Sequence, residues 1–128
     1  MMQQIAPSLR WFALLMLCAA YLQGGVVKLA DYTGAQAEMA HFGLPQWFAA
    51  GVIALELGAS AMILTGIGRW LGAIALAGFT LLATLIVLRF WQLPVGPERF
   101  MAANAFFEHI GLAGGFVLVA LHDLGSRK

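Results

Sequence analysis

Four long apolar runs dominate the chain, and three shorter segments between them hold many of its polar residues. Each run is close to the ~20 residues that a helix needs to cross the hydrocarbon core of a bilayer. The pattern predicts an all-α integral membrane protein in which residues 1–128 form a single membrane domain. The predicted spans are about residues 9–30, 46–67, 70–91 and 101–121.

The first connection, residues 31–45, is the longest and the most polar of the three. Thr33 and Gln36 have the spacing of a capping box, which is typical of a helix start. The apolar residues that follow share one helical face, as in an amphipathic helix: Ala35, Met39 and Phe42. We therefore expect a short helix that lies on the membrane surface.

The other two connections are shorter. Residues 66–69 leave room only for a tight turn, and residues 92–100 contain Pro94, Gly96 and Pro97, which predict irregular structure. Short connections join neighbouring antiparallel helices. The four spans should therefore form an up-down-up-down four-helix bundle.

Composition indicates that lipid surrounds this bundle. Of the 128 residues, 62% are hydrophobic and 10% are charged. A soluble domain carries about 25% charged residues, and its small core would not bury so much apolar surface. The formal net charge of +1 does not suggest the basic patch of a nucleic-acid interface. Cys18 is the single cysteine, so an internal disulfide cannot form.

An even number of spans puts both termini and the second connection on one side of the membrane. That side holds four basic residues, and the opposite side holds three. The positive-inside rule therefore predicts cytoplasmic termini, by a margin of a single residue. The residues counted are Arg10, Arg69, Arg127 and Lys128 on the terminal side, and Lys28, Arg89 and Arg99 on the other.

Polar residues within the spans gather in one half of the bilayer. Because the spans alternate in direction, the end of the first, the end of the third and the start of the fourth meet on one side. Glu56 is about eleven residues into the second span, ~16 Å from its start and close to the midplane. Charged side chains in hydrocarbon are costly and usually face a bundle interior or a wet cavity. The candidate residues are Lys28, Glu56, Arg89, Asn104, Glu108 and His109, and Tyr21 and Gln23 extend the polar lining inward.

Two interpretations of these six residues remain open. In the structural one, Lys28 or Arg89 neutralises a buried carboxylate and fixes how the helices pack. In the functional one, the residues line a cavity open to the outer face that binds a polar head group or handles protons. A quinone suits such a cavity, because its carbonyls need donors and its ring needs an apolar slot.

Metal and covalent cofactor sites are not expected. The chain has no His-Glu-x-x-His motif for a zinc protease. A haem held by two histidines needs both at similar depth, and His109 is the one histidine clearly inside a span. An organic ligand such as a quinone is therefore the cofactor that these residues best accommodate.

Several short motifs occur in order along the chain. They are Gly25-Val26-Val27-Lys28, Gly43-Leu44-Pro45, Leu55-Glu56-Leu57-Gly58 followed by Gly66 and Arg69, and Ala113-Gly114-Gly115-Phe116. In this order and spacing they resemble the DoxX-like family of membrane proteins over nearly the whole chain. The resemblance implies a four-helix protein of the bacterial inner membrane. Relatives include the small subunit of an archaeal thiosulfate:quinone oxidoreductase and proteins associated with oxidative or thiol stress.

Two features depart from the family pattern. The usual Gly-Pro-Gly segment near the C-terminus is missing, and the chain has His122-Asp123-Leu124-Gly125-Ser126 there instead. Glu108 stands where a lysine or another polar residue is frequent. A direct transfer of the thiosulfate role therefore does not follow from the resemblance.

Three functions from different classes are compatible with these observations. The first is an accessory subunit of a redox or stress-related assembly, rather than an enzyme alone, with a quinone-adjacent or proton-handling pocket and a partner that carries the redox centre. The second is a non-catalytic membrane scaffold. The third is a transporter of small solutes or protons, formed by a homo-oligomer. In each case we expect helix packing at four glycines, Gly25, Gly58, Gly111 and Gly115.

Overall fold

The computed structural model describes residues 2–126, with side chains from residue 6 onward. Its elements are α1 (Met2–Ala30), α2 (Tyr32–His41), α3 (Phe48–Thr65), α4 (Arg69–Val87), the 3-10 helix η1 (Phe90–Gln92) and α5 (Pro97–Ser126). Four helices in this part of the chain are long and apolar enough to cross a membrane, which confirms the predicted all-α class. Arg127 and Lys128, which entered the charge count, lie outside the described residues.

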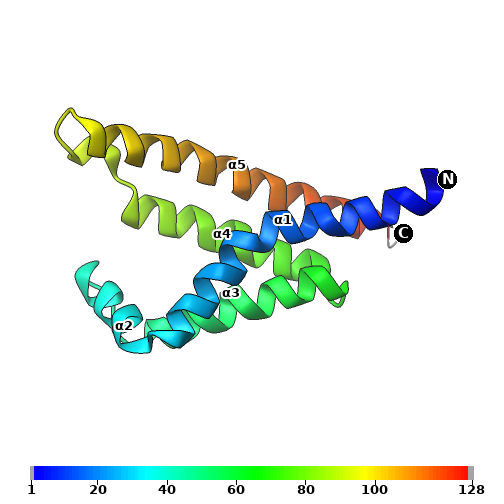
Figure 1. The fold of residues 1–128 in the computed structure, drawn as a ribbon, viewed down its shortest axis with the longest axis horizontal. Coiled ribbons are helices and arrows are strands. Elements are labelled where there is room, and N and C mark those ends of the chain that lie inside the picture. The colour runs from blue at the N-terminus through cyan, green and yellow to red at the C-terminus, as the bar shows by residue number, and fades with distance from the viewer. Residues whose placement is uncertain (1, 127–128) are drawn as a thin grey trace.

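The four long helices pack in series rather than in a closed ring. α3 packs against α1 and α4, α5 packs along α4, and α1 touches α5 only slightly. Figure 1 shows the result: the pair α1 and α3 diverges from the pair α4 and α5 toward the end that carries α2 and η1, while the start of α1 and the end of α5 lie at the opposite end, which we call the terminal end. The bundle is therefore tight at its terminal end and open at the other, which we call the open end.

Two helices extend well beyond their predicted spans. α1 starts at Met2 instead of residue 9, and α5 covers Pro97–Ser126 instead of 101–121. Hydropathy marks only the apolar part of a helix, whereas polar residues at its ends can remain helical. Pro97 fits the start of α5, because the first turn of a helix does not use the N–H that proline lacks.

The core lies in the terminal half of the bundle, where all four long helices meet. Its fully buried side chains include Cys18 of α1, Ile63 of α3, Leu76 of α4 and Phe116 of α5. α3 and α4 approach so closely that a Cβ added to Gly72 would lie 2.8 Å from the carbonyl oxygen of Ala59. Small residues thus allow close helix contact, as is usual where lipid provides no hydrophobic drive for association.

The turn between α3 and α4 is tight, as expected, and it anchors the terminal end. Gly66 and Gly68 have φ values of 81° and 64°, which favour glycine. The Arg69 Nε donates to the carbonyl of Ile63 at 2.7 Å and closes the turn. The backbone N–H of Trp70 donates to Asp123 Oδ2 at 3.0 Å, so a carboxylate from α5 caps the positive end of α4.

α2 is the short helix expected in the first connection, but its N-cap was predicted wrongly. Asp31, not Thr33, is the cap, and its Oδ1 accepts a hydrogen bond from the N–H of Gly34 at 3.0 Å. Only Asp31 separates α1 from α2, so the second helix begins before the capping-box residues. The predicted apolar face is present: Ala35 and Met39 are buried, packed against Ala49 of α3.

Candidate functional site

A cavity of about 430 Å³ occupies the open end, between the diverging helix pairs. All five α-helices contribute to its walls, which are largely apolar. Three phenylalanines, Phe42 near α2, Phe48 of α3 and Phe79 of α4, supply flat aromatic surface. A volume of this size is within the range of about 300–1,000 Å³ that small-molecule pockets have. The site therefore combines room for an organic ligand with a small number of polar groups.

An ion pair forms one polar wall. Lys28 Nζ, in the last turn of α1, lies 3.0 Å from Glu56 Oε1, in the middle of α3. Glu56 is only 5% exposed, so its carboxylate depends on this partner in a dry environment. The lysine ammonium has three N–H donors, of which Glu56 accepts one. The others remain available to a ligand in the cavity.

Glycines of α1 bring the two charged groups together. A Cβ on Gly25 would lie 2.6 Å from Leu57 Cδ2, and one on Gly24 would lie 3.1 Å from Glu56 Oε2. α1 and α3 therefore lie close together at the level of the ion pair. The Gly-x-x-Lys and Leu-Glu-x-Gly motifs meet at this point, so they encode one contact rather than two separate features.

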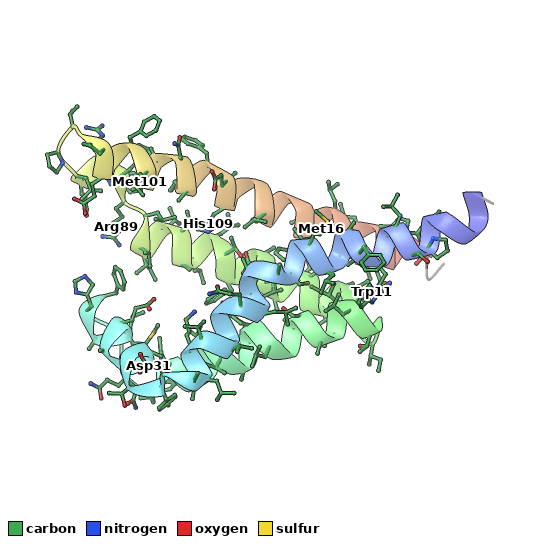
Figure 2. The ribbon with its side chains drawn as sticks, viewed as in Figure 1. Trp11, Met16, Asp31, Arg89, Met101 and His109 are labelled. Atoms are coloured by element: carbon green, nitrogen blue, oxygen red, sulfur yellow. The ribbon has the colours of Figure 1, made fainter. Side chains whose placement is uncertain are left out.

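His109 reaches the cavity from the opposite side. It lines the pocket from α5, and its Nδ1 is buried without a hydrogen-bond partner. Figure 2 shows His109 on the side of α5 that faces α4. A ring nitrogen is either a donor or an acceptor, and leaving it unpaired in a buried place is unfavourable. This nitrogen is therefore a candidate contact for the polar atom of a ligand.

Hydroxyl groups mark the inner end of the cavity. The Tyr21 hydroxyl of α1 forms a short hydrogen bond with the Thr80 hydroxyl of α4. Thr84, one turn further along α4, is also buried at the wall. Tyr21 was expected in the lining, whereas Gln23 is exposed outside it. The threonines were missed, although their four-residue spacing puts both on one face of an otherwise apolar helix.

Three of the six candidate residues do not line the cavity. Asn104 and Glu108 are exposed on the outer face of α5. Arg89 is exposed just after α4, where its Nε donates to the carbonyl of Leu85 at 2.7 Å. Glu108 and His109 are adjacent in sequence, so their side chains point about 100° apart around the helix. The structure thus brings together Lys28, Glu56 and His109 from the predicted set.

Of the four predicted packing glycines, two lie at helix contacts and two do not. Gly25 packs on Leu57, and a Cβ on Gly115 would lie 3.4 Å from Leu17 Cδ1, so both are at helix contacts. Gly58 and Gly111 have no neighbouring atom within 4 Å of an added Cβ. These two glycines lie on the outer surface of the bundle.

The donors in the cavity suit an organic ligand. Within residues 2–126, no group of three His, Cys, Asp or Glu side chains is arranged to hold a metal ion. The polar residues that line the cavity are instead spread over all five α-helices, among them Lys28 of α1, Glu38 of α2 and His109 of α5, and the rest of the wall is largely apolar. Such spacing can orient a molecule that is mainly apolar and carries a few polar atoms.

The fold and this cavity define a class, a multi-pass membrane protein built as a four-helix bundle with an amphipathic pocket. The DoxX family model matches residues 11–89, which is more than half of the chain, so the chain belongs to the DoxX family. A relative in Escherichia coli (strain K12), inner membrane protein YqjF, is 30% identical over 106 residues, or 83% of this chain and 77% of that protein. No solved structure matches the chain. The family predicted from the motifs is confirmed.

The family match does not cover the whole site. Lys28 and Glu56 lie within residues 11–89, whereas α5 and His109 follow the matched segment. The ion pair is therefore built from the part of the chain that the family model describes. The opposite wall of the cavity, which α5 forms, is built from the part that the family model does not match.

Proposed function

We propose that this chain is a membrane subunit of a redox or stress-related assembly, and that its cavity binds a quinone. The observation that carries the proposal is the unpaired Nδ1 of His109, which lines a mainly apolar cavity together with the Lys28–Glu56 ion pair. The relative named as an inner membrane protein supports a location in the bacterial inner membrane. The charge count favours cytoplasmic termini, so the open end would face outward.

Quinone chemistry fits the polar and apolar parts of the cavity. The ring of a quinone would lie among Phe42, Phe48 and Phe79, since aromatic rings favour offset or edge contacts. One carbonyl would accept from Lys28 and the other would meet His109. The isoprenoid tail would leave between the diverging helix pairs, directly into lipid.

Reduction of a quinone to a quinol takes up two electrons and two protons. Glu56, Lys28 and His109 are groups that can hold or pass protons at the cavity wall. The electrons must come from elsewhere, because this proposal assigns the chain no redox centre of its own. A partner subunit that carries such a centre would therefore complete the assembly, and this chain would act as an accessory subunit.

Solvent extraction of the gently purified protein tests quinone binding. The wild type should release a stoichiometric quinone, and His109→Phe should lower the quinone content up to about tenfold, since one hydrogen bond is worth ~0.5–1.5 kcal/mol. Glu56→Gln should also lower it, because this change removes the charge partner that holds Lys28 at the cavity wall. Glu108→Gln is the matched control, because this carboxylate is exposed outside the cavity. A wild-type protein without quinone, or equal loss in the control, would refute the proposal.

A scaffold without catalytic role is the second candidate. It is favoured by the burial of Glu56 in an ion pair that joins α1 to α3, and by the open glycines on the outer surface. In that case Glu56→Gln should impair assembly and thermal stability, while whatever complex remains should keep full activity. Quinone release from the wild type separates the two candidates.

Transport has less support. Between the cavity and the terminal end, Ile63, Leu76 and Phe116 are completely buried and form a mainly apolar layer, with which the Cys18 thiol and the Ser60 hydroxyl are also buried. A proton or polar solute would need hydrogen-bonding groups through that layer. An apolar barrier of this kind argues for a pocket that is closed on one side.

A further inference from the structure

A second cavity, of about 400 Å³, lies at the terminal end of the bundle, separate from the first. α1 and α5 form its walls, and Arg69 at the start of α4 closes it. Most of its residues are either apolar or basic. Leu14, Leu17 and Leu118 supply apolar wall, whereas Arg10, Arg69 and His122 bring basic groups. We call it the terminal groove.

The arginines that line the terminal groove outnumber its one carboxylate, which belongs to Asp123. Within residues 2–126, neither Arg10 nor Arg69 forms an ion pair, and Arg10 is exposed. The one carboxylate in the groove, Asp123, is engaged by the N–H of Trp70. Arg69 uses its Nε for the carbonyl of Ile63, which leaves its terminal nitrogens for other partners. With two arginines and one carboxylate among its lining residues, the groove carries a net positive charge.

The order of these groups along the helices matches an amphipathic molecule. Arg10 and Leu17 are seven residues apart on α1, so the basic group lies ~10 Å from the apolar end along the helix axis. Arg69 begins α4, and Arg10 lies four residues after the start of the apolar span of α1, so both are near the level where membrane-spanning helices meet the polar interface. Trp11 and Trp70 beside them are of the type that favours this interface.

We propose that the terminal groove binds an anionic phospholipid, with the phosphate between Arg10, Arg69 and His122 and an acyl chain along Leu14, Leu17 and Leu118. Guanidinium groups bind phosphate with paired N–H donors, and basic pockets between spanning helices on one side of the membrane hold lipid head groups. A soluble phosphate would make no use of the apolar wall. The occupant is therefore a lipid of the leaflet at the terminal end.

Lipid retention in a neutral detergent tests this site. Phosphatidylglycerol or phosphatidylcholine is added to the purified full-length protein, and bound lipid is counted by native mass spectrometry. The wild type should retain phosphatidylglycerol in preference to phosphatidylcholine. Arg10→Gln should weaken phosphatidylglycerol binding about fivefold, the effect of ~1 kcal/mol per basic group near a membrane surface. The matched control Arg99→Gln removes the same charge at the open end and should bind as the wild type does.

A second variant addresses the apolar half of the groove without changing charge. Leu118 is 69% exposed, so Leu118→Trp can be introduced without disturbing the core, and its indole should fill the groove and lower lipid retention. Equal retention of the two lipids by the wild type, or equal weakening by Arg99→Gln, would overturn the proposal. Competition by inorganic phosphate as effective as that by lipid would also overturn it, since the occupant would then be a soluble anion.

Discussion

Lys28 Nζ and Glu56 Oε1 lie 3.0 Å apart and join the last turn of α1 to the middle of α3. The pair lies at the wall of the open cavity, with Glu56 almost completely buried. The contact therefore has two consequences, since it supports the packing of α1 on α3 and presents a cation to whatever enters the cavity. Its energetic role can be measured apart from any ligand.

Removal of Lys28 should destabilise the protein strongly. Lys28→Met leaves the Glu56 carboxylate buried without its partner, and the expected loss is about 3 kcal/mol, the lower end for a buried pair, because Lys28 itself is partly exposed. Lys28→Met combined with Glu56→Leu should recover much of the loss, since both charges are gone. Reversible unfolding in mixed micelles gives the free energy of unfolding of the wild type, the single variant and the double variant.

Arg89→Met is the control for this comparison. Arg89 is an exposed cation at the same end of the bundle, and among the described residues it forms no ion pair. Its removal should change the free energy of unfolding by less than about 0.5 kcal/mol. If Lys28→Met were no more harmful than Arg89→Met, the ion pair would have no stabilising role.

The hydroxyl pair of Tyr21 and Thr80 should behave as a coupled unit. Either Tyr21→Phe or Thr80→Val leaves the other hydroxyl buried without its partner, at a cost of about 1–3 kcal/mol. The double variant should cost less than the sum of the two single ones, because it leaves no orphaned hydroxyl. A double-mutant cycle in the same unfolding assay measures this difference. Strict additivity would show that the two hydroxyls do not interact.

Gly72 should tolerate no side chain, in contrast to another glycine of the same helix. Gly72→Ala would bring a Cβ to 2.8 Å from the Ala59 backbone oxygen, so α3 and α4 must separate, at about 1–3 kcal/mol. Gly78→Ala is the control, since its Cβ would meet no atom within 4 Å. Thermal stability in detergent compares the two variants. A similar melting temperature for both would contradict the close approach of the two helices.

For α5, the sequence predicted the depth of the polar residues in the membrane but not which of them faces the cavity. The three candidate site residues of this helix, Asn104, Glu108 and His109, share one half of the membrane, which the alternation of spans predicts. Which of them faces inward depends on how α5 is rotated against α4. Adjacent residues point about 100° apart, so Glu108 and His109 cannot both face the cavity directly. The packing of α5 against α4 decides that His109 is the residue of the three that lines the cavity.

The sequence also could not predict which cation pairs with Glu56. The sequence left Lys28 and Arg89 as alternatives, because both end a span on the same side of the membrane. α3 lies between α1 and α4, so either neighbour could supply a cation. Lys28 is selected because Gly25 lets α1 approach α3 closely at that level. Arg89 follows the end of α4 and bonds to its own helix.

The sequence by itself determined the membrane class, the four helices, the family and the shared end of the bundle at which Lys28 and His109 lie. These properties follow from hydropathy, span length and span direction, which are local features or follow from chain order. The tertiary structure alone decided that α1 and α5 meet at only a few positions, such as Leu17 against Gly115, so that the bundle opens into a cavity at one end and a groove at the other. Helix rotation and separation depend on side-chain packing between segments far apart in sequence, where a single glycine or phenylalanine decides the fit.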